Sequence, residues 1–381
     1  MSWKTVTLGD ISSNIQTGPF GSQLHQSDYS EEGTPVVMPK DLVSGHISEA
    51  SIARVSENHV NRLSRHRIEV GDILYSRRGD VGRCAFATDM EQGWLCGTGC
   101  LRVTIDRSKA VPKFVFYQLQ KAETVGWVEK HAVGATMLNL NTSILSRVPI
   151  EIPSIKEQQV IVDMLSAYDD LIENNQNQIK LLEEAAQRLY KEWFVDLRFP
   201  GHETTSITDG IPEGWETVVV TDMLEIKYGK DHKALEDGNI PVYGSGGVMR
   251  KVNKILHSGE SVLIPRKGSL NNILLVNGDF WTIDTMFFSI PRKPNVAKYV
   301  YLFLSGVDMY AMNIGAAVPS MTVKILDGMK VLCPSTEMLA QFEKVVGLYF
   351  SMIELLKKKN ESLAEARDLL LPKLMNREIE V

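Results

Sequence analysis

PSIKEQQVIVDMLSAYDDLIENNQNQIKLLEEAAQRL, residues 153–189, returns as PSTEMLAQFEKVVGLYFSMIELLKKKNESLAEARDLL, residues 334–370. The two stretches align without a gap at an offset of 181 residues, and 9 of their 37 aligned pairs are identical. In both, apolar residues recur at alternating spacings of four and three, which is the pattern of a helix that packs along one seam. The sequence therefore predicts two long helices that belong to an internal duplication, over residues 153–196 and 334–375.

An asparagine lies in the apolar seam of each predicted helix, Asn175 in the first and Asn360 in the second, at positions that do not align in the duplication. A buried polar residue in such a seam usually fixes register and partner choice at some cost in stability. Two matching seams in one chain favour pairing of the helices with each other; the alternative is that each helix packs on its own domain. The predicted seam consists of Ile161, Leu165, Tyr168, Ile172, Asn175, Ile179, Leu182 and Leu189 in the first helix and Phe342, Val346, Tyr349, Ile353, Leu356, Asn360, Leu363 and Leu370 in the second.

The duplication extends upstream of both helices. GDILYSRRG (71–79) returns as GESVLIPRKG (259–268), and KFVFY (113–117) returns as KYVYL (298–302). The offset falls from 212 residues at the first pair of matching tryptophans to 181 at the helices, where it stays fixed. A segment that keeps its length while its sequence drifts indicates a spacer whose length matters.

The bodies that precede the helices, residues 1–152 and 215–333, are predicted as mixed α/β domains. Short runs rich in β-branched and aromatic residues, such as LRVTI (101–105) and MFFSI (286–290), predict strands. Residues 197–214 are polar and rich in chain breakers, which indicates a linker. The predicted fold class is α+β, with two mixed α/β domains that are each followed by a long spacer helix.

The charge of the chain is unevenly distributed. The 381 residues carry a net charge of −6, which at first argues against a nucleic-acid partner. Residues 151–200 alone contribute −5, from 5 basic and 10 acidic side chains, so the domain bodies are near neutral and can hold basic faces. No apolar run approaches the ~18 residues of a membrane span, and the N-terminus has no apolar signal core. We expect a soluble cytoplasmic protein.

Motifs that carry chemistry are missing from the sequence. It has no phosphate-binding loop, no Asn/Asp-Pro-Pro-aromatic tetrapeptide of a methyltransferase and no His-Glu-x-x-His zinc motif. Cys96 and Cys100 lack a second pair at metal-binding spacing, so we interpret them as buried thiols. We therefore predict no catalytic residue, no metal site and no cofactor in this chain.

Basic clusters are the better functional signal, because the planar guanidinium of arginine binds guanine edges and phosphates with two hydrogen bonds. Any one cluster could instead be an ordinary solvated surface. The same Arg/Lys-Arg/Lys-Gly element at the same place in both copies favours a DNA contact. Ser245, in the turn GSGG (244–247), belongs either to a phosphate cradle or to a plain turn. The candidate DNA-binding residues are Arg62, Arg65, Arg67, Arg77, Arg78, Arg83, Ser245, Arg250, Lys251, Lys254, Arg266 and Lys267.

Several longer motifs resemble those of a known family. They are GPFGS (18–22), PVYGSGG (241–247), GATMLNLN (134–141) followed by EQQ (157–159), and LYKEWFVDLRFPGHE (189–203). With the duplication, they make the chain similar to the DNA-specificity subunit of a type I restriction-modification system. The second helix departs from the pattern at its start, where TEM (336–338) replaces the EQQ of the first.

The resemblance implies two target recognition domains, separated by two long antiparallel coiled-coil helices and related by a pseudo-two-fold axis. Each domain would read one half of a bipartite, asymmetric target in double-stranded DNA. The helices would set the gap between the halves and dock two methyltransferase subunits, which restriction and translocation subunits would join. S-adenosylmethionine, ATP and Mg²⁺ would be bound by those partners. Two alternatives remain: a self-contained DNA methyltransferase or nuclease, and a coiled-coil scaffold without a DNA role.

Overall fold

The computed structural model describes residues 3–20, 23–134, 138–312 and 319–379. Three parts of the motifs above, Gly21, Ser22 and the segment 135–137, lie outside the described residues. The chain folds into two compact units, one of residues Met1–Ile172 with Glu361–Val381, the other of Glu173–Asn360. Each unit holds one mixed α/β domain together with one part of each long helix.

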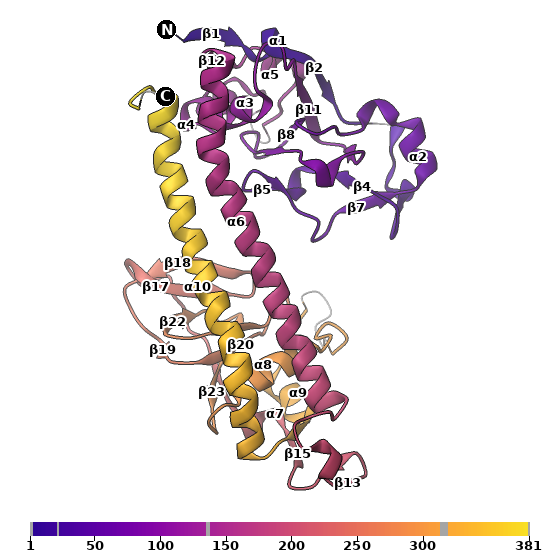
Figure 1. Ribbon diagram of the computed structural model, residues 1–381, viewed down its shortest axis with the longest axis vertical. Coiled ribbons are helices and arrows are strands. Elements are labelled where there is room, and N and C mark those ends of the chain that lie inside the picture. Colours follow the sequence, from indigo (N-terminus) through magenta and orange to yellow (C-terminus); the bar gives the residue numbers. More distant parts are fainter. Residues whose placement is uncertain (1–2, 21–22, 135–137, 313–318, 380–381) are drawn as a thin grey trace. The chain divides into compact units, whose positions relative to one another are not determined.

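The two long helices occur where the heptad pattern predicts them (Figure 1). Helix α6 covers Ile155–Tyr190, and helix α10 covers Thr336–Met375. A capping box starts α6, because the hydroxyl of Ser154 and the carboxylate of Glu157 satisfy each other's free backbone N–H groups, at 3.3 and 3.0 Å. At 1.5 Å per residue, the 36 residues of α6 extend about 54 Å.

The first domain is built on two four-stranded sheets. One has the antiparallel order β2-β11-β8-β9, and the other has the order β10-β4-β7-β3. A further pair, β1-β12, brings the N-terminal strand against the strand that precedes α6. The strands are β1 (Lys4–Thr7), β2 (Ser12–Thr17), β3 (Tyr29–Ser30), β4 (Thr34–Val37), β5 (Leu42–Val43), β6 (His46–Ile47), β7 (Ala53–Val55), β8 (Ile73–Ser76), β9 (Cys84–Phe86), β10 (Leu95–Cys96), β11 (Cys100–Ile105) and β12 (Pro149–Ile152); the helices include α2 (Glu57–Arg62), α3 (Pro112–Leu119) and α4 (Ala122–His131).

The second domain repeats this architecture. Its sheet β16-β23-β20-β21 corresponds to β2-β11-β8-β9, and its pair β15-β24 corresponds to β1-β12, which confirms the duplication. The strands are β15 (Glu216–Val219), β16 (Leu224–Tyr228), β17 (Asp237–Gly244), β18 (Gly247–Val252), β19 (His257–Ser258), β20 (Ser261–Pro265), β21 (Leu274–Val276), β22 (Asp279–Thr282), β23 (Met286–Pro291) and β24 (Lys330–Cys333); the helices include α7 (Val220–Met223), α8 (Ala297–Ser305) and α9 (Val323–Gly328).

A glycine ends the first strand of the main sheet in both domains. A Cβ atom on Gly18, after β2, would collide with the carbonyl oxygen of Gly97, and a Cβ atom on Gly229, after β16, would collide with that of Ile283. The two collisions are equivalent in the duplication, so the close backbone approach is a shared feature of the fold.

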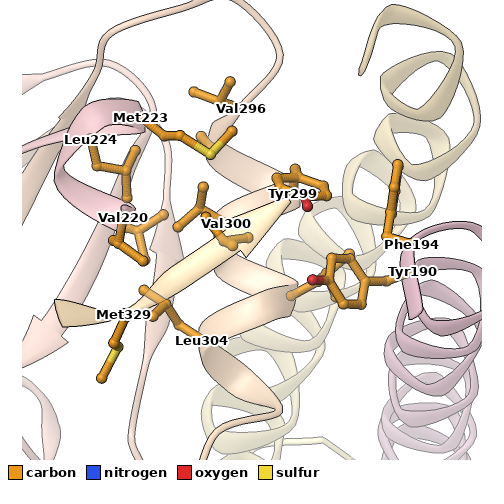
Figure 2. Packing of buried hydrophobic residues seen from close by; sticks show 14 of the residues in the cluster. Tyr190, Phe194, Val220, Met223, Leu224, Val296, Tyr299, Val300, Leu304 and Met329 are labelled. Carbon is orange, nitrogen blue, oxygen red and sulfur yellow. The ribbon is translucent and has the colours of Figure 1, made fainter. Parts of the chain in front are cut away.

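Residues 197–214, which the sequence predicts as a linker, are partly packed. Phe199 is buried against Trp215, with ring centroids 4.7 Å apart, and β13 (Ile207–Thr208) pairs with β14 (Ile211–Pro212). Aromatic residues at the end of α6 and in the π-helical turn that follows it (Lys191–Val195) continue this core: Figure 2 shows Tyr190 and Phe194 against Tyr299 of α8. The second domain is therefore fastened to the end of α6 by an aromatic core.

The long helices pair antiparallel. In the first unit, Asp169 of α6 binds Arg367 of α10, and in the second unit Asn175 binds Asn360 and Trp193 packs against Phe342. Residue numbers thus rise along one helix as those of the contact residues fall along the other. All sixteen predicted seam residues are buried or half-buried. The two seam asparagines meet directly, with Asn175 Nδ2 donating to Asn360 Oδ1 at 2.7 Å.

Candidate nucleic-acid interface

In the first domain the Arg-Arg-Gly element follows the central strand β8. The N–H of Arg77 donates to the carbonyl of Gly99 at 2.7 Å, and the carbonyl of Arg77 accepts from the N–H of Leu140 at 2.8 Å. Gly79 then adopts a φ of +74°, a left-handed conformation that glycine takes without strain. These bonds fix the position at which the two arginine side chains leave the sheet.

In the second domain the Arg-Lys-Gly element follows β20 and is held in the same way. The N–H of Arg266 donates to the carbonyl of Thr285 at 2.8 Å, and its carbonyl accepts from the N–H of Met321 at 2.9 Å. Gly268 has a φ of +86°. Thr285 and Met321 correspond in the duplication to Gly99 and Leu140 of the first domain. The backbone of this element is therefore held by equivalent hydrogen bonds in both copies.

The side chain of the second residue in each element is available to bind a ligand. Arg78 and Lys267 are exposed, and within the described part of the chain their side chains make no hydrogen bond or ion pair. The first residue is half-buried and lies over an aromatic ring: Arg77 over Phe20, and Arg266 over Tyr228. The sequence marks Phe20 only as part of the motif GPFGS (18–22) and indicates neither ring contact, because each contact joins residues about forty to sixty positions apart.

The Gly-rich turn of the second domain joins this cluster. A Cβ atom on Gly268 would lie 2.8 Å from Ser245 Oγ, which places the serine against the Arg-Lys-Gly element. The carbonyl of Ser245 accepts a hydrogen bond from the side chain of Asn272 at 2.9 Å, and the hydroxyl of Tyr310 donates to the carbonyl of Gly268 at 3.2 Å. Ser245, Lys267 and Tyr310 therefore belong to one corner of the domain.

Most of the other candidate side chains already have partners inside the protein. Arg83 makes two hydrogen bonds to Asp80, at 2.8 and 3.0 Å, and Arg250 binds Asp237 at 2.9 Å. Their charges are partly neutralised, which weakens them as DNA contacts. Arg62, Arg65 and Arg67 lie on α2 and the turn after it, and they donate hydrogen bonds to Gln23, His66 and Asn61, respectively. Lys251, on β18, and Lys254, after it, are exposed.

His66, between two of these arginines, is buried, with 2% of its surface exposed. Its Nε2 accepts a hydrogen bond from Arg65 Nε at 3.0 Å. Burial is the main cause that lowers the pKa of His66 to about 4, and the charges of Arg65 and Arg102 lower it further. The imidazole is therefore neutral at neutral pH, as its role of hydrogen-bond acceptor requires.

Acid should destabilise the first domain through His66. Between its ordinary pKa of 6.5 and the folded-state pKa of about 4, the unfolded chain binds a proton that the folded domain does not. Stability from this group is complete above pH 6.5 and is lost as the pH falls through 4, with a loss of about 2 kcal/mol by pH 5. Urea unfolding at pH 7 and at pH 5 measures this loss of unfolding free energy. His66→Gln should show a smaller loss than the wild type, and an equal loss in both would contradict the assignment.

The described residues offer little else for chemistry. No group of three or more His, Cys, Asp or Glu side chains among them could hold a metal ion. The four cysteines are buried, and burial raises the pKa of Cys84 and of Cys96 to about 12, which keeps both as unreactive thiols. No helix in the described segments is long and apolar enough to cross a membrane.

Comparison with known proteins agrees with this architecture. The family model of the type I restriction modification DNA specificity domain matches residues 1–184 and 212–365. The chain is 26% identical to the MjaIX specificity subunit of a type I restriction enzyme from Methanocaldococcus jannaschii, over 91% of this chain and 87% of that protein. It is 22% identical to the HindI specificity subunit from Haemophilus influenzae, over 99% of both.

The crystal structure of the S subunit from M. genitalium shares the fold, with a TM-score of 0.57 at 20% identity over 98% of this chain and 96% of that one. The chain therefore belongs to the type I restriction modification DNA specificity family, and it is a specificity subunit of such a system.

Proposed function

We propose that this specificity subunit reads a bipartite, asymmetric target in double-stranded DNA, one half with each domain. The observation that carries the proposal is the pair Arg78 and Lys267: two cations at duplicated positions, exposed, unpaired in the described chain and held by equivalent backbone bonds. Such residues supply the phosphate and base contacts of a DNA reader. The domains differ in sequence around this shared element, so the half-sites they read differ as well.

The long helices are proposed to space the domains and to dock two methyltransferase subunits. Large apolar side chains remain uncovered on them: Leu348 is 70% exposed and Leu355 is 59% exposed on α10, and Leu171 is 44% exposed on α6. Leu348, the 45%-exposed Met352 and Leu355 recur at spacings of four and three, so they share one face of α10, and an exposed apolar face of this kind marks a protein interface. Leu171 occupies the duplicated position of Met352, which gives each unit one exposed apolar side chain at the same place on its helix, although Leu348 and Leu355 align with Ala167 and Asn174. The duplicated pair suits two copies of one partner.

Catalysis is proposed to reside in those partners. The chain has no motif for S-adenosylmethionine, ATP or Mg²⁺, so methyl transfer to the DNA would be performed by the methyltransferase subunits, and cleavage by restriction subunits that join them. The complex would act in the cytoplasm, where the cell's DNA is found.

Removal of Arg78 or Lys267 tests the DNA-reading proposal. Arg78→Ala and Lys267→Ala should each weaken binding of the assembled methyltransferase complex to its target by about 1–2 kcal/mol, because one DNA contact is lost. Folding stability should change by less than about 0.5 kcal/mol, since both side chains are exposed. Fluorescence anisotropy with a labelled duplex measures the affinity.

Arg83→Ala is the matched control, because it removes an exposed arginine that is already paired with Asp80. It should weaken binding less than either variant. Loss of the same affinity in all three variants would point to overall charge alone, and unchanged affinity for Arg78→Ala and Lys267→Ala would refute the proposed interface.

A further inference from the structure

We propose that Phe20 and Tyr228 are positioning residues for base recognition, and that each half-site contains a G·C pair read by the arginine that lies over the ring. This inference rests on the proposed reading of DNA by both domains. The guanidinium carbon of Arg77 lies 5.9 Å from the ring centroid of Phe20, and that of Arg266 lies 5.5 Å from the ring centroid of Tyr228. An arginine over an aromatic face is attracted by the ring, and we infer that this contact restricts the orientation of the guanidinium.

The two rings are exposed although they are large and apolar. Phe20 has 57% of its surface exposed and Tyr228 has 56%. Tyr228 is the last residue of β16, and Phe20 comes just after the corresponding strand β2, so both domains place a ring at the same strand end. The rings are not aligned residue by residue in the duplication. The same arrangement has therefore been reached at two slightly different positions, which favours a functional reason over simple inheritance of a sequence motif.

The guanidinium groups over these rings have unused donors. Within the described residues the Arg77 side chain makes no hydrogen bond, and its buried Nε has no acceptor. Arg266 uses one donor, from Nη1 to the carbonyl of Asp284 at 3.1 Å. Arginine has five donors, so both side chains keep a forked edge that can still bind an acceptor pair. Leaving such donors unpaired in a half-buried place is unfavourable, which is consistent with a ligand that completes them.

Guanine is the partner that such a fixed fork fits best. The O6 and N7 atoms of guanine accept both hydrogen bonds of one guanidinium edge in the major groove, and this is the most common specific contact between proteins and DNA. A phosphate can also accept two hydrogen bonds from a guanidinium, but the point charge of a lysine binds it as well, so a phosphate site does not require the planar fork.

The duplication separates these two roles. The position over the ring is arginine in both copies, Arg77 and Arg266, whereas the next position is arginine in one copy and lysine in the other, Arg78 and Lys267. A site that tolerates lysine suits phosphate, and a site that keeps the planar fork suits a base edge. We assign base recognition to the first position and phosphate binding to the second.

Mapping of methylated sites tests the assignment with the assembled methyltransferase complex. The wild type should methylate a bipartite site with an invariant G·C pair in each half. Phe20→Leu should reduce discrimination at that pair in one half by about two- to fivefold, which is the fold-change of a weak cation–π contact, and should leave the other half unchanged. Tyr228→Leu should do the same in the other half. Phe20→Tyr and Tyr228→Phe keep a ring and should keep the discrimination.

A second pair of variants separates recognition from stability. Arg77→Lys and Arg266→Lys keep the charge and remove the fork, so each should relax the G·C requirement of its own half-site while the unfolding transition stays in place. A half-site that contains no G·C pair would overturn the inference for the domain that reads it. Equal discrimination by the Leu variants and by Phe20→Tyr and Tyr228→Phe would overturn it as well. If the wild-type complex methylates no bipartite site at all, the proposed function itself is wrong.

Discussion

Four residues inserted into each long helix should lengthen the gap between the half-sites by one base pair and abolish methylation of the original target. The insertions belong between Ile172 and Glu173 in α6 and between Asn360 and Glu361 in α10. Both points lie at the boundary between the two compact units, so the pairs Asp169–Arg367 and Asn175–Asn360 are kept.

The size of the change is set by helix geometry. Four residues add about 6 Å of helix and rotate the rest of the helix by one full turn plus about 40°. One base pair rotates DNA by roughly 34–36° and advances it by about 3.4 Å. The rise alone would allow two base pairs, and the rotation requires one. Rotation should decide, because a domain that is turned out of its groove cannot reach base edges, whereas bending of the DNA can absorb a few ångströms along its axis.

Insertion into α6 alone is the control for this experiment. It shifts one helix against the other and misaligns the contacts of one unit, so it should remove methylation at every spacing. An insertion after Leu189, at the end of α6, is less suitable: Tyr190 and Phe194 pack there against Tyr299, and that aromatic core would be separated from the helix. Mapping of methylated sites reads the spacing directly. An unchanged gap with full activity in the doubly extended protein would show that the helices are not the ruler.

The sequence predicts the helices and the duplication well because both are periodic or repeated along the chain. It does not predict which residues meet. Asn175 and Asn360 are not aligned in the duplication, yet they form one hydrogen bond, because antiparallel pairing reverses the order of one helix. The sequence shows which residues of the two copies are aligned, but it does not show which residues of the two helices are in contact.

The candidate DNA residues show a similar limit. Clusters of Arg and Lys are visible in the sequence, but their availability depends on partners. Arg83 is paired with Asp80, three residues before it, which is a local signal that sequence reading can use. The ring of Phe20 under Arg77 is a contact between distant segments, and only the folded strand ends bring the two side chains together.

Replacement of Asp169 by alanine should strongly destabilise the first unit. This carboxylate, with 9% of its residue surface exposed, joins three helices. It accepts hydrogen bonds from the hydroxyl of Tyr117 on α3, at 2.5 Å, and from Nη1 of Arg367 on α10, at 2.8 Å, and Lys113 lies 3.9 Å away. The pKa of Arg367 is raised by its bonds to Asp169 and Asp368, although burial acts in the opposite direction, so the guanidinium stays charged.

Without the carboxylate, the half-buried cation of Arg367 and the buried hydroxyl of Tyr117 lose their acceptor. Removing one partner of a buried ion pair costs about 3–5 kcal/mol, and we expect Asp169→Ala to fall in this range. Asp169→Asn keeps a hydrogen-bond acceptor and should lose less. The double variant Asp169→Leu with Arg367→Leu removes both charges, so it should lose less stability than Asp169→Ala, and its remaining loss should come mainly from the buried Tyr117 hydroxyl, which still lacks an acceptor. Urea unfolding measures the free energy of unfolding of these variants, and a loss below about 1 kcal/mol for Asp169→Ala would show that this network does not hold the domain to its helices.

The second domain provides the comparison for that result. Lys298, the duplicated counterpart of Lys113, binds Glu343 of α10 at 2.6 Å and Glu260 at 2.5 Å. In each domain, the lysine at this duplicated position thus contacts an acidic residue on the long helix that follows the domain in the chain. If these ion pairs fix each recognition domain on its helix, Asp169→Ala should also impair methylation at temperatures where the variant is still folded. A variant that is destabilised but fully active below its unfolding temperature would limit the network to a role in stability.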